Sequence, residues 1–84
     1  MLTQGFSVYY SPLNCLEART EGKIIAVRNQ DKDMLKKILA MGLDKGSNIT
    51  LEQTFPSFVI KVDQTYITVD EEIAKSIKVR VTSP

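Results

Sequence analysis

Histidine is absent from the sequence, and cysteine occurs once in 84 residues, as Cys15. Histidine is the commonest general base and the commonest side-chain ligand of transition metals, so its absence removes most catalytic and metal-centre arrangements. A single cysteine cannot form an intramolecular disulfide, and without histidine it lacks the usual partner of a cysteine nucleophile. We therefore expect a protein that is not an enzyme and holds no cofactor, with Cys15 packed as a small apolar residue near Leu13 and Leu16.

A surplus of charge of one sign is also missing, because 11 basic and 10 acidic residues leave a net charge of +1. Nucleic-acid binders usually concentrate lysine and arginine, since counterion release from phosphates drives their affinity. No apolar run approaches the roughly 20 residues that span a bilayer. The N-terminus lacks the basic start and unbroken apolar stretch of a signal peptide. These absences predict a cytoplasmic protein that neither binds nucleic acid nor inserts into the membrane.

The length suits one domain, because 84 residues divided in two would leave each half without a core. We expect an N-terminal arm at residues 1–12 and a single domain at residues 13–84. The arm contains Tyr9 and Tyr10 ahead of Pro12, which favours extended geometry in the residue before it. Such an arm could add to the sheet edge of a second copy and form a homo-oligomer.

One β-branched apolar run and four stretches of alternating apolar and polar residues predict about five short strands. These lie at residues 22–27, 49–52, 58–62, 67–69 and 77–81. Between the first two, Asp31 or Asp33 can cap a helix with apolar residues at i, i+3 and i+4 spacing, and Gly42 fits the left-handed position that ends helices. Asp70 can cap a short helical turn before the last strand. The pattern predicts a mostly-β fold, a small closed or nearly closed barrel with one inserted helix.

Two acidic groups have some features of a metal site. Asp31 and Asp33 have the spacing of a calcium-loop start, but the loop would need glycine and glutamate where Lys36 and Gly42 stand, so capping is the better interpretation. The run from Asp70 to Glu72 contains the densest acidic cluster. A helix cap is favoured there too, because three adjacent side chains point in different directions.

The stretch from Leu13 to Val81 resembles the FeoA family of bacterial ferrous iron uptake. The resemblance is carried, in order, by Leu13-x-x-Leu16, Gly22-Lys23-Ile24, Leu35-x-x-x-Leu39-Ala40-Met41-Gly42-Leu43-Asp44-Lys45-Gly46, Ile67-Thr68-Val69 and Ala74-x-x-Ile77-x-Val79. The chain departs from the family in loops. Arg19 stands where glycine is frequent, Asp70 near a usual basic residue, and the expected hairpin turn at Asp63-Gln64 lacks the common glycine.

The resemblance implies an SH3-like barrel and a protein partner, the membrane iron transporter FeoB, with its cytosolic GTP-binding portion. It predicts an accessory protein that modulates iron uptake through protein–protein contact. One alternative is a metal-sensing or metallochaperone barrel that binds a transition metal ion such as iron through Glu71 and Glu72. Another is a regulatory SH3-like domain related to that of iron-dependent repressors, although 84 residues leave no room for the helix-turn-helix of a repressor.

The expected contact surface combines exposed basic and apolar residues near the helix exit with an aromatic residue in a loop between strands. Its members are Lys36, Lys37, Met41, Leu43 and Phe55. We expect the helix exit and the loop to converge. Phe55 is included because aromatic residues on loops are favoured anchors at protein interfaces.

Overall fold

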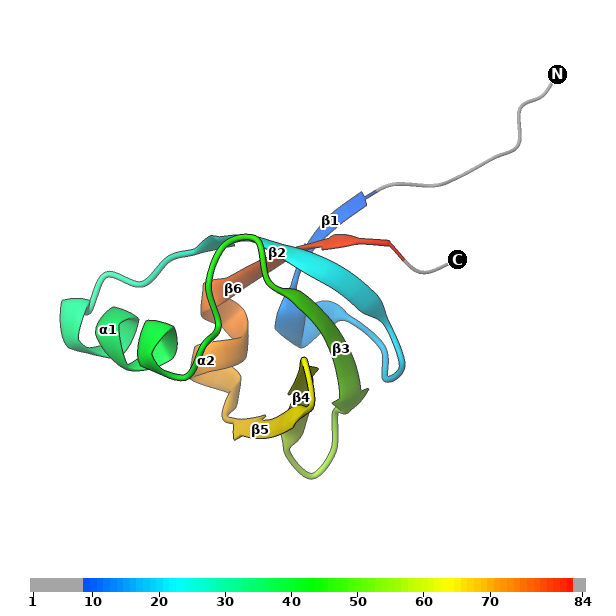
Figure 1. Cartoon of the computed structure of the whole chain (residues 1–84). Coiled ribbons are helices and arrows are strands. Elements are labelled where there is room, and N and C mark those ends of the chain that lie inside the picture. The colour runs from blue at the N-terminus through cyan, green and yellow to red at the C-terminus, as the bar shows by residue number, and fades with distance from the viewer. Residues whose placement is uncertain (1–8, 83–84) are drawn as a thin grey trace, which may run out of the picture.

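The computed structural model describes residues 9–82, which form one antiparallel six-stranded sheet with two α-helices and a 3-10 helix (Figure 1). The elements are β1 (Tyr9–Pro12), η1 (Leu13–Cys15), β2 (Glu21–Val27), α1 (Lys32–Ala40), β3 (Asn48–Gln53), β4 (Phe58–Val62), β5 (Thr65–Val69), α2 (Glu71–Ser76) and β6 (Ile77–Val81). The predicted mostly-β architecture is confirmed, with its five strands and inserted helix. The structure adds β1, a strand that lies within the predicted arm.

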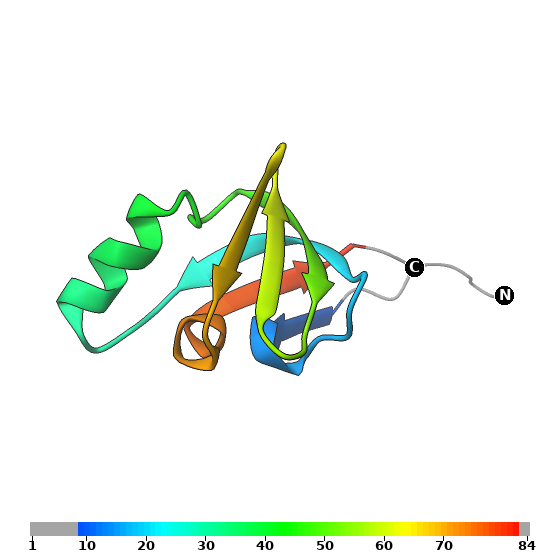
Figure 2. The ribbon, with the colours of Figure 1, turned by 90° about the horizontal axis from the view of Figure 1, so that it is seen from below.

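The sheet runs in the order β1-β6-β2-β3-β4-β5 and curls into a barrel (Figures 1 and 2). Register shifts interrupt β2 between Ile24 and Ala26 and β3 between Leu51 and Gln53. Such bulges bend a strand and increase its twist. Helix α2 lies against η1, the end strand β1 and its neighbour β6.

The predicted arm is divided between described and undescribed residues. Residues 9–12 form β1, which pairs with β6 of the same chain, Tyr10 opposite Arg80 and Pro12 opposite Lys78. Residues 1–8 of the predicted arm lie outside the described residues. Addition of the arm to a second copy stays a prediction.

Apolar side chains from every strand except β1, together with η1 and both helices, fill the barrel. The fully buried large members are Leu13, Ile24, Ile38, Leu43, Leu51, Ile60, Ile77 and Val79. In β6, every second residue is buried, as period-2 alternation predicts. Each fully buried aliphatic side chain contributes about 1.5–3 kcal/mol of transfer free energy, so this cluster is the main source of stability.

Helix α1 begins and ends where the sequence predicts. The Asp31 carboxylate accepts hydrogen bonds from the backbone N–H groups of Asp33 at 2.9 Å and Met34 at 3.3 Å. Gly42 follows the helix with a φ of +88°. Asp31 is therefore a helix cap, which agrees with the preference, based on the sequence, for a cap over a calcium ligand.

Gly22 lies where β2 packs tightly against β6. A Cβ atom at this position would collide with Val79 Cγ1 and would lie 2.6 Å from the Arg80 carbonyl oxygen. Glycine therefore lets the two strands meet over the core at a point where another residue would force them apart.

Candidate functional site

The interior of the barrel offers little polar chemistry. Ser76 is the one buried polar side chain in the part of the chain that the structure describes, and it is 9% exposed. Its hydroxyl donates to the Glu72 carbonyl oxygen at 3.0 Å and accepts from the Asn29 amide at 2.9 Å. Through these two hydrogen bonds, Ser76 links α2 to the segment after β2.

The helix part of the expected contact surface is only partly exposed. Lys36 and Lys37 are exposed on α1, and Met41 is partly buried against the core. Leu43, by contrast, is 0% exposed. The prediction that Leu43 is a surface residue is therefore wrong. The left-handed Gly42 ends the helix, and the chain then turns inward, so that Leu43 packs in the core.

Phe55 is 84% exposed in the loop between β3 and β4, the most exposed of the large hydrophobic residues in the described range. Phe58, two residues after Pro56, is partly buried against the core, as its phase with Ile60 predicts. The loop thus presents one phenylalanine to solvent and directs the other into the barrel.

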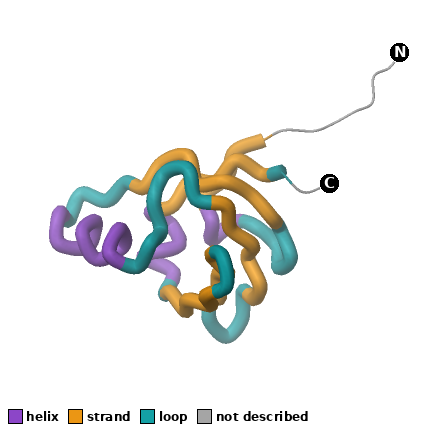
Figure 3. The backbone as a smooth tube through the Cα atoms, in the orientation of Figure 1, coloured by secondary structure: helices purple, strands orange, loops and turns teal. Residues whose placement is uncertain are grey.

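The helix exit and the Phe55 loop do not converge. They precede and follow β3, a strand of six residues that spans roughly 20 Å. Figure 3 shows α1 at one end of the barrel and the loop that contains Phe55 at its lower edge, and Figure 2 separates them as well. The expectation of one continuous surface is therefore wrong, because β3 holds its two parts apart.

The strand register creates a surface that sequence reasoning missed. Arg80 lies opposite Tyr10 on one side and opposite Lys23 on the other, so the three side chains form a row on the outer face of β1, β6 and β2. Lys78, two residues earlier on β6, shares this face, and all four residues are exposed. The alternation in β6 indicated that Lys78 and Arg80 face solvent, but only the pairing brings Lys23 beside them.

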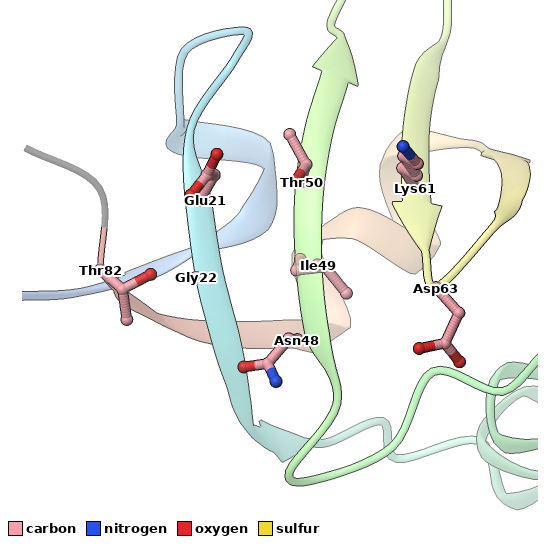
Figure 4. Close-up of a pocket in the computed structure, with 8 residues that line it drawn as sticks. All are labelled: Glu21, Gly22, Asn48, Ile49, Thr50, Lys61, Asp63 and Thr82. Carbon is pink, nitrogen blue, oxygen red and sulfur yellow. The ribbon is translucent and has the colours of Figure 1, made fainter.

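A shallow depression of about 360 Å³ lies over β2, β3 and β4 (Figure 4). Thr50 stands opposite Glu21 on one side and Lys61 on the other, and Asp63 lies in the turn after β4. The Lys61 ammonium lies 5.7 Å from the centre of the Tyr66 ring. Carboxylates and an ammonium share this depression, so it does not select ligands of one charge.

The acidic residues at the start of α2 accept hydrogen bonds from one backbone N–H group and from one side-chain amide. The Asp70 carboxylate accepts from the Ile73 N–H at 2.9 Å, and Glu71 accepts from the Asn14 amide at 3.5 Å. Across residues 9–82, no three histidine, cysteine, aspartate or glutamate side chains are grouped so that they could hold a metal ion. Asp70 is thus a helix cap, as favoured above.

Cys15 lies at the end of η1 with its side chain exposed. The prediction that it packs as a small apolar residue near Leu13 and Leu16 is wrong. The short helix directs Leu13 and Leu16 inward instead, and the Cys15 thiol lies 3.8 Å from the Asn14 side-chain oxygen.

No helix among the described residues has the length and apolar character needed to cross a membrane.

Comparison with known proteins gives consistent matches. The family model described as "FeoA domain" matches residues 11–81. The chain is 24% identical over 79 residues to "Putative Fe(2+) transport protein A" of Leptolyngbya boryana, covering 93% of this chain and 96% of that protein.

Two of the solved structures that share the fold illustrate the match. The FeoA-like protein from Clostridium acetobutylicum superposes with a TM-score of 0.80 at 24% identity, over 89% of this chain and 90% of that one. The FeoA of Stenotrophomonas maltophilia, solved in complex with zinc and described as a prokaryotic SH3 domain protein, gives 0.70 at 16% identity, over 80% and 86%. The SH3-like fold is thereby confirmed.

Proposed function

Because this chain belongs to the FeoA family, we propose that it is a cytosolic accessory protein of ferrous iron uptake that binds the membrane transporter FeoB and modulates it by protein–protein contact. A filled barrel of this size has no room for an enclosed active site, which favours action through the outer surface. The cytosolic GTP-binding portion of the transporter is the proposed partner. This chain is proposed to act without catalysing a reaction.

The observation that carries the proposal is the exposure of Phe55. An aromatic side chain that is 84% exposed leaves a large apolar area in water, and burial of such a side chain contributes about 1.5–3 kcal/mol. Interface hot spots are typically aromatic or arginine side chains that enter a pocket on the partner. Pro56, which follows Phe55, limits the conformations of the loop, and this lowers the conformational entropy lost on binding.

Helix α1 supplies a second, separate contact in this proposal. Lys36 and Lys37 are exposed there, Leu39 is 40% exposed, and Met41 is partly buried beside them. Since β3 separates α1 from Phe55, a partner that touches both must extend along the barrel. We expect the lysines to influence the association rate more than the affinity, as peripheral charges generally do.

The proposal is tested by titrating the transporter's cytosolic portion with wild-type chain, with Phe55→Asp and with the control Gln64→Asp. Gln64 is exposed in the turn between β4 and β5, so the control adds the same charge in another turn. Loss of the phenylalanine contact should raise Kd about 10- to 100-fold. Gln64→Asp should bind like wild type.

Circular dichroism and thermal melts should show that both variants are folded. Equal affinities for wild type and folded Phe55→Asp would exclude Phe55 from the contact. Failure of wild type to bind at all would contradict the proposed partner.

A further inference from the structure

The loop before β2 holds an arginine in an unfavourable backbone conformation. Arg19 has a φ of +78°, and the other residues with positive φ in the range 9–82 are Gly42, Gly46 and Asp63. Glycine has no Cβ atom and aspartate tolerates the left-handed region, whereas a long side chain is disfavoured there. Arg19 is therefore the one described residue whose side chain is poorly suited to its left-handed backbone.

Two features of the backbone hold Arg19 in this conformation. The Thr20 N–H donates to the Glu17 carbonyl oxygen at 3.3 Å, which makes Arg19 the third residue of a tight turn. The Arg19 N–H donates to the Leu51 carbonyl oxygen at 2.6 Å, and the Leu51 N–H donates to the Thr20 carbonyl oxygen at 2.8 Å. Arg19 and Thr20 thus oppose one residue of β3, as in a G1 bulge, whose first residue is usually glycine. Both the turn and the bulge favour glycine where arginine stands.

The bulge places Arg19 at the end of the barrel that carries Phe55. Leu51 lies two residues before the end of β3 at Gln53, and Phe55 lies two residues beyond that end. The four residues from Leu51 to Phe55 span at most about 14 Å. Figures 1 and 2 both show the loop between η1 and β2 beside this end of β3. A standard interface covers about 800 Å² on each partner, a patch roughly 30 Å across, so one interface can include both side chains.

We infer that Arg19 determines the specificity of the contact made by Phe55, by binding a carboxylate that lies beside the apolar pocket of the partner. This inference rests on the proposed function. The Arg19 side chain is exposed, and a guanidinium can bind a carboxylate through two parallel hydrogen bonds. Arginine and aromatic side chains are enriched among interface hot spots.

The strained backbone supports a binding role for the side chain. Residues in disfavoured backbone regions cluster at functional sites, and bulges re-aim a side chain. The hydrogen bonds to Leu51 form the loop before the partner binds, so little backbone entropy is lost on binding. Arginine at this position thus costs stability in the free protein and gains an interaction in the complex.

The charges around Arg19 favour a single carboxylate over a polyanion. Glu17 and Glu21 lie two residues before and two residues after Arg19. Glu52 follows Leu51 on β3, the strand that the bulge faces. A row of phosphates on a nucleic acid or an anionic bilayer would meet these acidic residues as well as the arginine. A single carboxylate held by paired hydrogen bonds depends on geometry and needs no surplus of positive charge.

The test titrates the transporter's cytosolic portion with wild-type chain, with Arg19→Gln and with the matched control Arg28→Gln. Both arginines are exposed, and the seven residues of β2 separate them by roughly 23 Å. Arg19→Gln should raise Kd about ten-fold, and Arg28→Gln should change it little. Arg19→Lys keeps the charge but loses the paired donors, so it should recover only part of the affinity.

A second readout separates a binding role from a structural one. Glycine suits a φ of +78°, so Arg19→Gly should raise Tm by a few degrees while it weakens binding as much as Arg19→Gln does. A lower Tm for Arg19→Gly overturns the inference, because the arginine would then serve stability.

The outcomes distinguish this inference from the proposed function. Wild-type affinity of Arg19→Gln, together with weak binding of Phe55→Asp, overturns the inference and leaves the proposed function standing. Equal weakening by Arg19→Gln and Arg28→Gln also overturns it, because net charge alone would then explain binding. Absence of wild-type binding contradicts both. Tighter binding of the wild-type chain to anionic vesicles or to an oligonucleotide than to the transporter portion overturns the choice of a protein carboxylate.

Discussion

Replacement of Gly22 by alanine tests the close packing of β2 against β6. The backbone φ at Gly22 is not in the left-handed region, so alanine is compatible with the local backbone. At such sites, Gly→Ala usually stabilises by about 0.4–1 kcal/mol, because it restricts the unfolded chain. Here the new methyl group would meet Val79 Cγ1 and would lie 2.6 Å from the Arg80 carbonyl oxygen. Gly22→Ala is stabilising if the restriction of the unfolded chain is the larger contribution, and destabilising if the steric cost of the new methyl group is larger.

Overpacking of a tight core costs about 1–3 kcal/mol. The Arg80 carbonyl belongs to the backbone of β6, which pairs with both β1 and β2, so it cannot move without disturbing two strand pairs. We therefore expect a net destabilisation of about 1–2 kcal/mol. For a domain of this size that lowers Tm by about 4–16 °C.

Urea denaturation and thermal melts of wild type, Gly22→Ala, Val79→Ala and the double variant measure this effect. In the Val79→Ala background the methyl group gains space on one side, so Gly22→Ala should cost less than it does in wild type. A neutral or stabilising Gly22→Ala would refute the packing argument. Equal costs in both backgrounds would show that Val79 is not the obstacle.

Two further predictions concern the helix and the core. Leu43→Ala should lower the free energy of unfolding by about 2–5 kcal/mol, because removal of a fully buried leucine side chain leaves a cavity. Urea denaturation measures this loss, and a loss below about 0.5 kcal/mol would contradict the core position of Leu43. Asp31→Ala should cost about 0.5–2 kcal/mol, because two backbone N–H groups lose their acceptor; in the same assay Asp31→Asn should retain most of the stability, and equal losses would argue against the cap.

Local patterns were enough to predict most of the fold. A β-branched run and period-2 alternation located five of the six strands, the pair Asp31 and Asp33 with Gly42 marked the two ends of α1, and Asp70 marked the start of α2. The hairpin turn at Asp63-Gln64 was also predicted without glycine, and Asp63 takes the positive φ of 56° in its place. Such features depend on a few neighbouring residues, so the sequence contains them directly.

The surface was harder to predict, because burial and register depend on residues far apart in the sequence. Leu43 follows a helix stop, a position typical of exposed loops, yet the turn at Gly42 leads it into the core. Cys15 lies between two buried leucines but faces solvent. The cross-strand pair of Lys23 and Arg80 depends on the alignment of β2 with β6, which no local pattern specifies.

The most direct test is calorimetric titration of the wild-type chain into the transporter's cytosolic GTP-binding portion, loaded in turn with GDP and with a non-hydrolysable GTP analogue. Recognition through the outside of a filled barrel predicts saturable binding in at least one nucleotide state. No detectable heat and no change in Tm of either folded protein, in both states, would contradict it.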